Sequence, residues 1–109
     1  MNKEKIKLDL LKLIKNQEHT TFMDIEQYFD AIGFNYHGIT EIVTVNHNVI
    51  LWNNWNIEAI KIVNELLECN LITMFKTYEE LYIINGLYTG IPVYQGKKPY
   101  KQWLPVEFN

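Results

Sequence analysis

Residues 56–85, NIEAIKIVNELLECNLITMFKTYEELYIIN, are the stretch around which the rest of the chain is organised. Asn56 is a favoured N-cap residue, and Glu58 lies in the first turn after it, where the helix dipole stabilises an anion. Asn70 tolerates the left-handed conformation that ends many helices. The pattern predicts a helix over about 57–69, because apolar side chains recur at helical spacing at Ala59, Ile60, Val63, Leu66 and Leu67.

Two short apolar segments follow this helix and are separated by the polar residues 76–80. Both are rich in residues that favour strands, so we expect wing strands over about 71–75 and 81–85, paired as a hairpin that folds back on the helix. A helix followed by such a hairpin is typical of the second half of a winged-helix domain. The predicted fold class is therefore α+β and winged-helix-like, with three helices and a small antiparallel sheet.

Two further helices are expected before this stretch. The first, over about 3–16, has Asn2 as its candidate cap and an apolar stripe opposite most of its lysines, which form either a solvated face or a phosphate-facing surface. The second, over about 22–32, starts at a pair that resembles a capping box, Thr21 and Asp24, and ends at Gly33. Its exposed side, with Asp24, Glu26 and Asp30, is acidic and is therefore a poor match to a DNA backbone.

A hairpin over about 40–52 is predicted between the second and third helices. Two apolar segments flank Asn46-His47-Asn48, residues of a type that accepts the positive φ of a tight loop. An ordinary helix-turn-helix has only a few residues at this position. Alternatively, part of the segment is irregular and only one strand joins the wing sheet. We expect Trp52 or Trp55, at the end of the segment, to lie in the core.

Length and composition limit the possible classes of protein. With 109 residues, 48 % of them hydrophobic, we expect one folded domain over 1–109 with an extended C-terminal tail. No apolar run reaches the roughly 20 residues of a membrane span, and the charged first residues do not resemble a signal peptide, so a cytoplasmic protein is expected. The single cysteine, Cys69, excludes an internal disulfide, and its spacing from Leu66 predicts a buried thiol.

The charges of the chain are unevenly distributed. The net charge is −3, yet residues 1–17 and 81–109 are basic, whereas residues 18–80 are acidic. Every basic residue is lysine, so the bidentate arginine contacts that read guanine are absent. The third predicted helix carries more glutamates than lysines and would repel phosphates. Either the blocks of charge serve solubility alone, or the protein meets different partners with different faces.

The C-terminal residues 95–108 mix lysines with aromatic rings. This combination is used by sites for single-stranded nucleic acids, in which lysines bind phosphates and rings stack on bases. Alternatively, Trp103 and its apolar neighbours pack onto the core while the lysines stay in water, and this is the fate we expect for Trp103. The candidate nucleic-acid-binding residues are Lys97, Lys98, Tyr100 and Lys101, with Lys76 in the predicted wing as an outlier.

Several segments together resemble a known group of small proteins. These segments are residues 48–52 (NVILW), the helix leading into Leu71-Ile72, residues 90–93 (GIPV) and residues 100–106 (YKQWLPV). Along nearly the whole chain the sequence resembles small winged-helix proteins of staphylococcal pathogenicity islands and chromosomal cassettes. The resemblance implies an accessory role in cassette replication, in which a small middle protein binds an A-family DNA polymerase and lets it prime.

No residue pattern indicates an enzyme, a cofactor or a metal site. His19, His37 and His47 are spaced too irregularly for zinc, and one cysteine cannot complete a Cys₂His₂ set. The chain contains no serine nucleophile and no phosphate-binding glycine loop. Glu79 and Glu80 are adjacent in a predicted turn and do not converge as a catalytic pair. We therefore expect a protein without intrinsic catalytic activity.

Three functional hypotheses follow. The first is an accessory protein that docks on a replication polymerase or primase while a basic terminus helps to hold template DNA. The second is a stand-alone winged-helix DNA-binding regulator, against which the missing arginine, the acidic third helix and the negative net charge all argue. The third is a mobile-element inhibitor that mimics DNA through its acidic surface and competes with DNA for a host protein.

Overall fold

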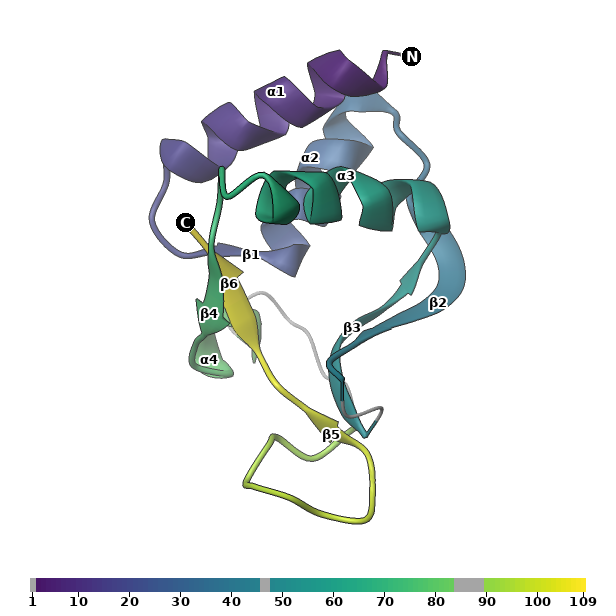
Figure 1. Ribbon diagram of the computed structural model, residues 1–109, viewed down its shortest axis with the longest axis vertical. Helices are drawn as coiled ribbons and strands as arrows, with labels where there is room; N and C mark the ends of the chain where they lie inside the picture. Colours follow the sequence, from purple (N-terminus) through teal and green to yellow (C-terminus); the bar gives the residue numbers. More distant parts are fainter. Residues whose placement is uncertain (1, 46–47, 84–89) are drawn as a thin grey trace.

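The computed structural model describes residues 2–45, 48–83 and 90–109, and within them the chain forms an α+β fold (Figure 1). The predicted fold class is confirmed at this level. None of the helices in these ranges is long and apolar enough to cross a membrane. The helices are α1 (Lys3–Lys15), α2 (Phe22–Ile32), α3 (Ile57–Glu68) and the short α4 (Glu80–Ile83). The strands are β1 (Thr20–Thr21), β2 (His37–Val43), β3 (Val49–Trp55), β4 (Met74–Lys76), β5 (Gln102–Trp103) and β6 (Val106–Phe108).

The three long helices begin at the residues that the sequence predicts. The side-chain oxygens of Asn2 and Asn56 accept backbone N–H groups at the starts of α1 and α3. Thr21 and Asp24 form a reciprocal capping box at the start of α2, and Gly33, with φ of 73°, ends it. Each of these contacts satisfies backbone groups that a helix end leaves without an intrahelical partner.

The end of α3 shows one confirmed and one wrong expectation. Asn70 has φ of 57°, as predicted for the residue that ends the helix. Cys69, expected to be buried, is exposed. It lies beyond the last helical residue, Glu68, where the chain turns away from the surface against which Leu66 packs. The thiol therefore has no packing role of the kind that we expected.

The hairpin between α2 and α3 is present. It runs from the start of β2 at His37 to the end of β3 at Trp55 and thus extends beyond the predicted 40–52 at both ends. Strands β2 and β3 pair antiparallel with shifts of register, and residues 46–47 of the predicted turn lie outside the described residues. Trp52 and Trp55 are both buried, as expected for at least one of them. Gly38 is required for the pairing, because a Cβ there would lie 2.6 Å from the carbonyl oxygen of Trp55.

The predicted wing hairpin is wrong. Of the expected strand 71–75, only residues 74–75 form a strand. They belong to β4 (Met74–Lys76), which pairs with β6. The expected partner strand 81–85 is replaced over its described part by the helix α4, and residues 84–85 lie outside the described residues. A short apolar run does not by itself distinguish a strand from a buried helical turn. Here long-range contacts stabilise the helical turn.

Tyr82 provides those contacts. Its ring is fully buried, its hydroxyl donates to the carbonyl oxygen of Val106 at 2.6 Å, and the backbone N–H of Phe22 donates to the hydroxyl oxygen at 3.2 Å. Burial raises the pKa of the Tyr82 phenol above its ordinary value. The helical turn of α4 thus fixes one side chain that joins α2 to β6.

The C-terminal residues, expected as an extended tail, contribute two strands. Strand β6 is the centre of a sheet with the order β1-β6-β4, antiparallel to both neighbours. Strand β5 pairs parallel with β3 at the edge of the second sheet, which has the order β2-β3-β5. The last described segment of the chain therefore connects both sheets (Figure 1).

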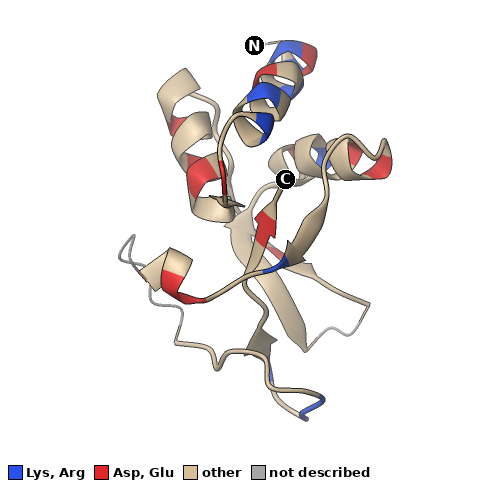
Figure 2. Ribbon diagram, turned by 90° about the vertical axis from the view of Figure 1, so that its left-hand side faces the viewer, with Lys and Arg blue, Asp and Glu red and all other residues tan. Residues whose placement is uncertain are grey.

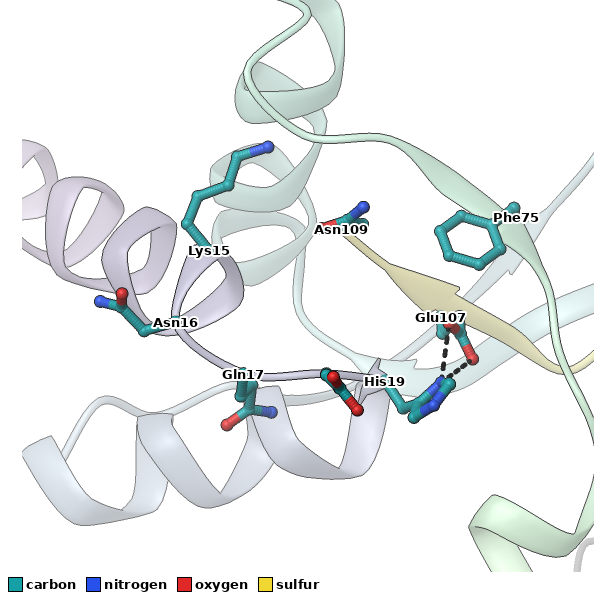
Figure 3. A pocket seen from close by; sticks show the side chains of 8 residues that line it. Lys15, Asn16, Gln17, His19, Phe75, Glu107 and Asn109 are labelled. Carbon is teal, nitrogen blue, oxygen red and sulfur yellow. Dashed lines mark hydrogen bonds and ion pairs between the residues drawn. The ribbon is translucent and has the colours of Figure 1, made fainter.

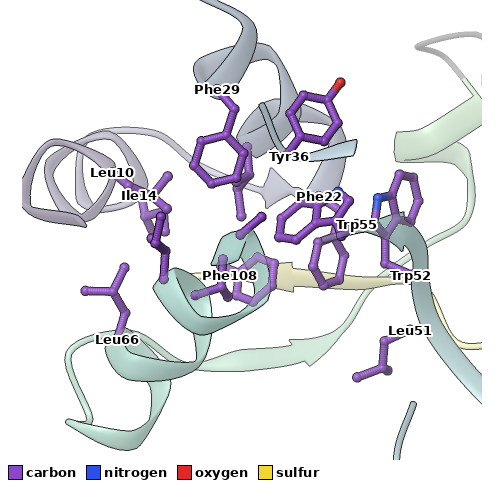
Figure 4. Packing of buried hydrophobic residues seen from close by; sticks show 14 of the residues in the cluster. Leu10, Ile14, Phe22, Phe29, Tyr36, Leu51, Trp52, Trp55, Leu66 and Phe108 are labelled. Atoms are coloured by element: carbon purple, nitrogen blue, oxygen red, sulfur yellow. The ribbon is translucent and has the colours of Figure 1, made fainter. Parts of the chain in front are cut away.

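An aromatic cluster lies where the two sheets meet the helices (Figure 4). The ring of Phe22 stacks on Trp52 and meets Trp55 and Phe108 edge-on, with centroid distances of 5.0–5.4 Å. The Nε1–H groups of Trp52 and Trp55 both donate to one carboxylate oxygen of Glu26, at 2.8 and 2.9 Å. Glu26, expected on an exposed acidic face, instead satisfies two indoles and fixes α2 on β3.

Ion pairs join α1 to α3. Lys3 pairs with Glu58, and the Lys7 ammonium lies 3.0 Å from a Glu65 carboxylate oxygen. The hydrogen bond from Lys7 to Glu65, followed by one to Glu4, raises the pKa of Lys7, and the hydrogen bond from Lys3 lowers the pKa of Glu58. Part of the acidic charge of α3 is thus neutralised within the molecule.

We predict that Glu26→Ala lowers the free energy of unfolding by about 2–5 kcal/mol, because two buried indole N–H groups lose a charged acceptor. Glu26→Gln keeps an oxygen acceptor and should lose less. Gln27→Ala, which removes an exposed side chain of the same helix, is the matched control and should change stability by no more than about 0.5 kcal/mol. Urea denaturation measures all three, and a Glu26→Ala value as small as the control would contradict the role of Glu26.

Stability should also fall at alkaline pH because of Tyr82. The folded-state pKa is raised, so this stabilising contribution is complete below the unfolded-state pKa of about 10 and is lost as the pH rises from there towards the folded-state pKa. Tyr82→Phe should cost about 1–3 kcal/mol at neutral pH and should show a smaller further loss above pH ~10. Equal alkaline losses in both proteins would assign the effect to other groups.

Candidate nucleic-acid and protein interfaces

Residues 94–101, which we call the basic loop, lie below β5 at one end of the molecule's long axis (Figure 1). Gln102, only 1 % exposed, holds the loop from inside. Its side-chain oxygen accepts the N–H of Gln95 at 2.8 Å, and its Nε2 donates to the carbonyl oxygen of Gly96 at 2.7 Å. These contacts fix both backbone groups, so the loop presents its side chains from a defined conformation.

The structure brings four of the five candidate residues together on this loop. Lys97, Lys98, Tyr100 and Lys101 are all exposed. Lys97 and Lys98 line an open hollow of about 560 Å³ with Asn48 and Pro99. Lys101 differs from them, because its ammonium lies 3.2 Å from a Glu41 carboxylate oxygen on β2. Two lysines and one ring therefore face water beside a third lysine that is already paired.

Lys76 lies apart from this group. It is the exposed last residue of β4, in the sheet β1-β6-β4, and β4 lies well above the basic loop along the long axis (Figure 2). The structure therefore does not join Lys76 to the loop in one site. A nucleic acid that contacts both would have to extend along the molecule.

Trp103 is part of the core, as expected. It is 5 % exposed, and its ring meets Tyr82 edge-on with a centroid distance of 5.1 Å. Among the candidate residues of the loop, Tyr100, which is 50 % exposed, therefore supplies the ring that is available for stacking.

Sequence reasoning missed Gln102 and Glu41. Gln102 sits between lysines and aromatic residues in a polar stretch, and nothing local distinguishes a buried loop anchor from an exposed glutamine. Glu41 is sixty positions from the lysine that it pairs with. A charged residue is expected to face water, which places Glu41 on a surface but does not name its partner.

The exposed face of α3 is acidic, as the sequence predicts. Glu58, Glu65 and Glu68 are exposed on it together with Lys61. Lys3 and Lys7 of α1 balance the first two of these acids. This face has no excess of positive charge with which to bind phosphates, so α3 lacks the charge expected of a recognition helix.

An apolar groove of about 360 Å³ lies between α3, the β2–β3 hairpin and β4. Its walls are mostly aliphatic, and some of the lining side chains also belong to the core. At its rim lie half-buried or exposed side chains that water can reach, namely Ile42, Ile60, Leu67 and Met74. We call this surface the α3–β2 groove. Grooves of this kind are typical of sites for apolar anchors from a partner protein.

Within the described ranges, no cluster of three histidine, cysteine or carboxylate side chains is arranged to hold a metal ion. Comparison with known proteins gives no match to any family model, to any curated protein or to any solved structure.

We predict that replacing Lys97, Lys98 and Lys101 together by alanine reduces the salt dependence of single-stranded DNA binding. The slope of log affinity against log salt should fall by about 0.7 for each lysine that contacts a phosphate. The melting temperature should stay nearly unchanged, because all three side chains are exposed. Lys61→Ala on α3 is the control and should leave the slope unchanged, whereas a loss of folding in the triple variant would show that the loop is structural.

Proposed function

We propose that this chain is a non-enzymatic accessory protein of a mobile genetic element, which binds a replication enzyme and helps it to hold template DNA. The enzyme would be a DNA polymerase or primase, as the resemblance of the sequence to cassette replication proteins implies. The observation that carries the proposal is the separation of two surfaces: an apolar groove beside the acidic α3, and a basic loop at the end of the long axis.

The arrangement of the elements supports a winged-helix variant. Helices α1, α2 and α3 accompany a sheet with the order β1-β6-β4, whose strands come from the α1–α2 connection, from just after α3 and from the C-terminal segment. Two insertions would distinguish the variant: the β2–β3 hairpin before α3, and the long segment between β4 and β6 that carries the basic loop. In this proposal the wing is enlarged rather than absent.

The groove supports a protein partner. Its rim exposes aliphatic side chains, and Ile57 and Leu71, near the two ends of α3, are also about half exposed. A helix that is acidic outside and apolar along its groove suits a partner segment with apolar anchors and basic flanks better than it suits a nucleic acid.

The alternative is a stand-alone DNA-binding regulator. The exposed Lys97 and Lys98 favour it, since lysines in a loop can bind phosphates without a basic recognition helix. The acidic face of α3 argues against it. The two functions differ in what the purified protein does alone: a regulator shifts duplex DNA at modest salt, and an accessory protein needs its enzyme.

The test is a pull-down of the tagged protein from cells that carry its native element, with nuclease present to remove DNA bridges. We expect one stoichiometric replication protein. Met74→Lys, which places a charge at the rim of the α3–β2 groove, should abolish its recovery. Ile39→Lys, at an apolar residue that is 95 % exposed and outside the groove, is the matched control and should retain the partner.

Recovery of the partner by both variants would place the interface elsewhere on the molecule. No retained protein, together with a shift of duplex DNA by the purified protein at modest salt, would refute the accessory role and support the regulator.

A further inference from the structure

A polar cleft, distinct from the hollow beside Lys97 and Lys98, lies between the end of α1 and the outer face of the sheet β1-β6-β4 (Figure 3). Its volume is about 560 Å³, which is sufficient for a small ligand. It is separate from the basic loop, because none of its residues belongs to 94–101. The lining residues are Lys15, Asn16, Gln17, Glu18, His19, Phe75, Glu107 and Asn109.

His19 and Glu107 form an oriented pair in this cleft. Glu107 is 6 % exposed, accepts the hydroxyl of Thr77 at 2.5 Å, and places both carboxylate oxygens 3.1 Å from Nδ1 of His19. Because a carboxylate only accepts hydrogen bonds, Nδ1 carries a proton, and Nε2 of a ring that is 59 % exposed is left for another group. The backbone of His19 has φ of 57°, which is uncommon for a residue other than glycine.

An exposed aromatic ring shares the cleft with His19. Phe75 on β4 pairs in register with Glu107, which pairs with Thr21 on β1, so the three side chains lie on one face of the sheet. The Phe75 ring is 43 % exposed. Figure 3 shows Phe75 and His19 on one side of the cleft and Lys15 on the other.

The lysines of α1 change their role along the helix. Lys3, Lys5 and Lys7 all form ion pairs with carboxylates, whereas no ion pair involving Lys12 or Lys15 of the last turn occurs among the described residues. Lys15, which lines the cleft, is thus without an ion-pair partner in the part of the chain that the structure describes.

We propose that this cleft binds one nucleotide of a single-stranded DNA, with Phe75 stacking on the base and Lys15 contacting the phosphate. A cation and an exposed ring that line one cleft are the combination that single-stranded sites use, and the exposed Nε2 of the His19 ring, which Glu107 orients, is a further polar group for the nucleotide. Glu107 and Thr77 act as positioning residues. The inference rests on the proposed role in holding template DNA and adds a contact at the sheet to the one at the basic loop.

Glu18 allows a test based on the direction in which DNA affinity changes. Its carboxylate is exposed at the rim and would repel a phosphate bound in the cleft. Glu18→Gln should therefore tighten DNA binding, whereas removal of Lys15 should weaken it. Opposite effects of two exposed neighbours are not expected from a purely structural role.

The experiment measures fluorescence anisotropy of a labelled oligothymidine of about 12 nucleotides with the full chain at low salt. Phe75→Ala should weaken binding about 5- to 150-fold, the range for loss of one stacked base, and Phe75→Trp should keep it. Lys15→Gln should lower the salt slope by about 0.7. Lys5→Gln, whose ammonium is paired with Asp9 on the same helix, is the matched control and should not change the slope.

The outcomes separate this inference from the proposed function. Unchanged affinity in Phe75→Ala and Lys15→Gln, with binding lost when the basic-loop lysines are replaced, overturns the cleft site and leaves the accessory role standing. If the wild-type chain binds no oligothymidine but retains its replication enzyme, the cleft inference also fails. If Phe75→Ala lowers the melting temperature, the affinities of Lys15→Gln and Glu18→Gln decide: opposite shifts support the cleft site, and unchanged affinities overturn it.

Discussion

The pairing of β6 between β1 and β4 is the constraint on which the rest of the structure depends. It joins the connection after α1 to the segment after α3, and reciprocal backbone hydrogen bonds between Thr73 and Asn109 extend the ladder. With β6 fixed at the centre, Tyr82 and Phe108 close the core around Phe22, and Glu107 is held on the outer face. The segment between β4 and β6 must then leave the sheet and return to it, and this excursion carries the basic loop to the far end of the molecule (Figure 1).

The sequence predicts local structure well because helix caps and apolar periodicity act within a few residues. Asn2, Thr21 with Asp24, and Asn56 mark the helix starts, and the hairpin before α3 follows from two apolar runs around a short polar turn. The wing was predicted wrongly because strand partners are chosen by long-range contacts. Residues 81–83 favour a strand locally, yet the two hydrogen bonds of Tyr82 stabilise a helical turn there, and β4 finds its partner some thirty positions later in β6.

The candidate sites likewise divide into features that a short segment of sequence predicts and features that depend on long-range contacts. A run of lysines with a tyrosine identifies the basic loop directly from sequence, because both residue types and their exposure follow from one short segment. The buried Gln102 that holds this loop, and the pairing of Lys101 with Glu41, depend on the fold. The cleft of His19, Phe75 and Glu107 is assembled from two strands, β4 and β6, the end of α1 and the connection after it, so no sequence pattern predicts it. In the proposed function, the acidic α3 and the groove beside it serve protein binding, and DNA is contacted from the edges of the molecule.

The most direct measurement is the affinity of the partner replication enzyme for single-stranded DNA, with and without saturating amounts of this protein. An accessory protein with separate protein and DNA surfaces should increase that affinity. Replacing Lys97 and Lys98 should remove the increase while the protein–enzyme complex persists. If this protein and DNA instead compete for the enzyme, so that the protein lowers the enzyme's affinity for DNA, the two surfaces do not act together and the DNA-mimic hypothesis replaces the accessory role.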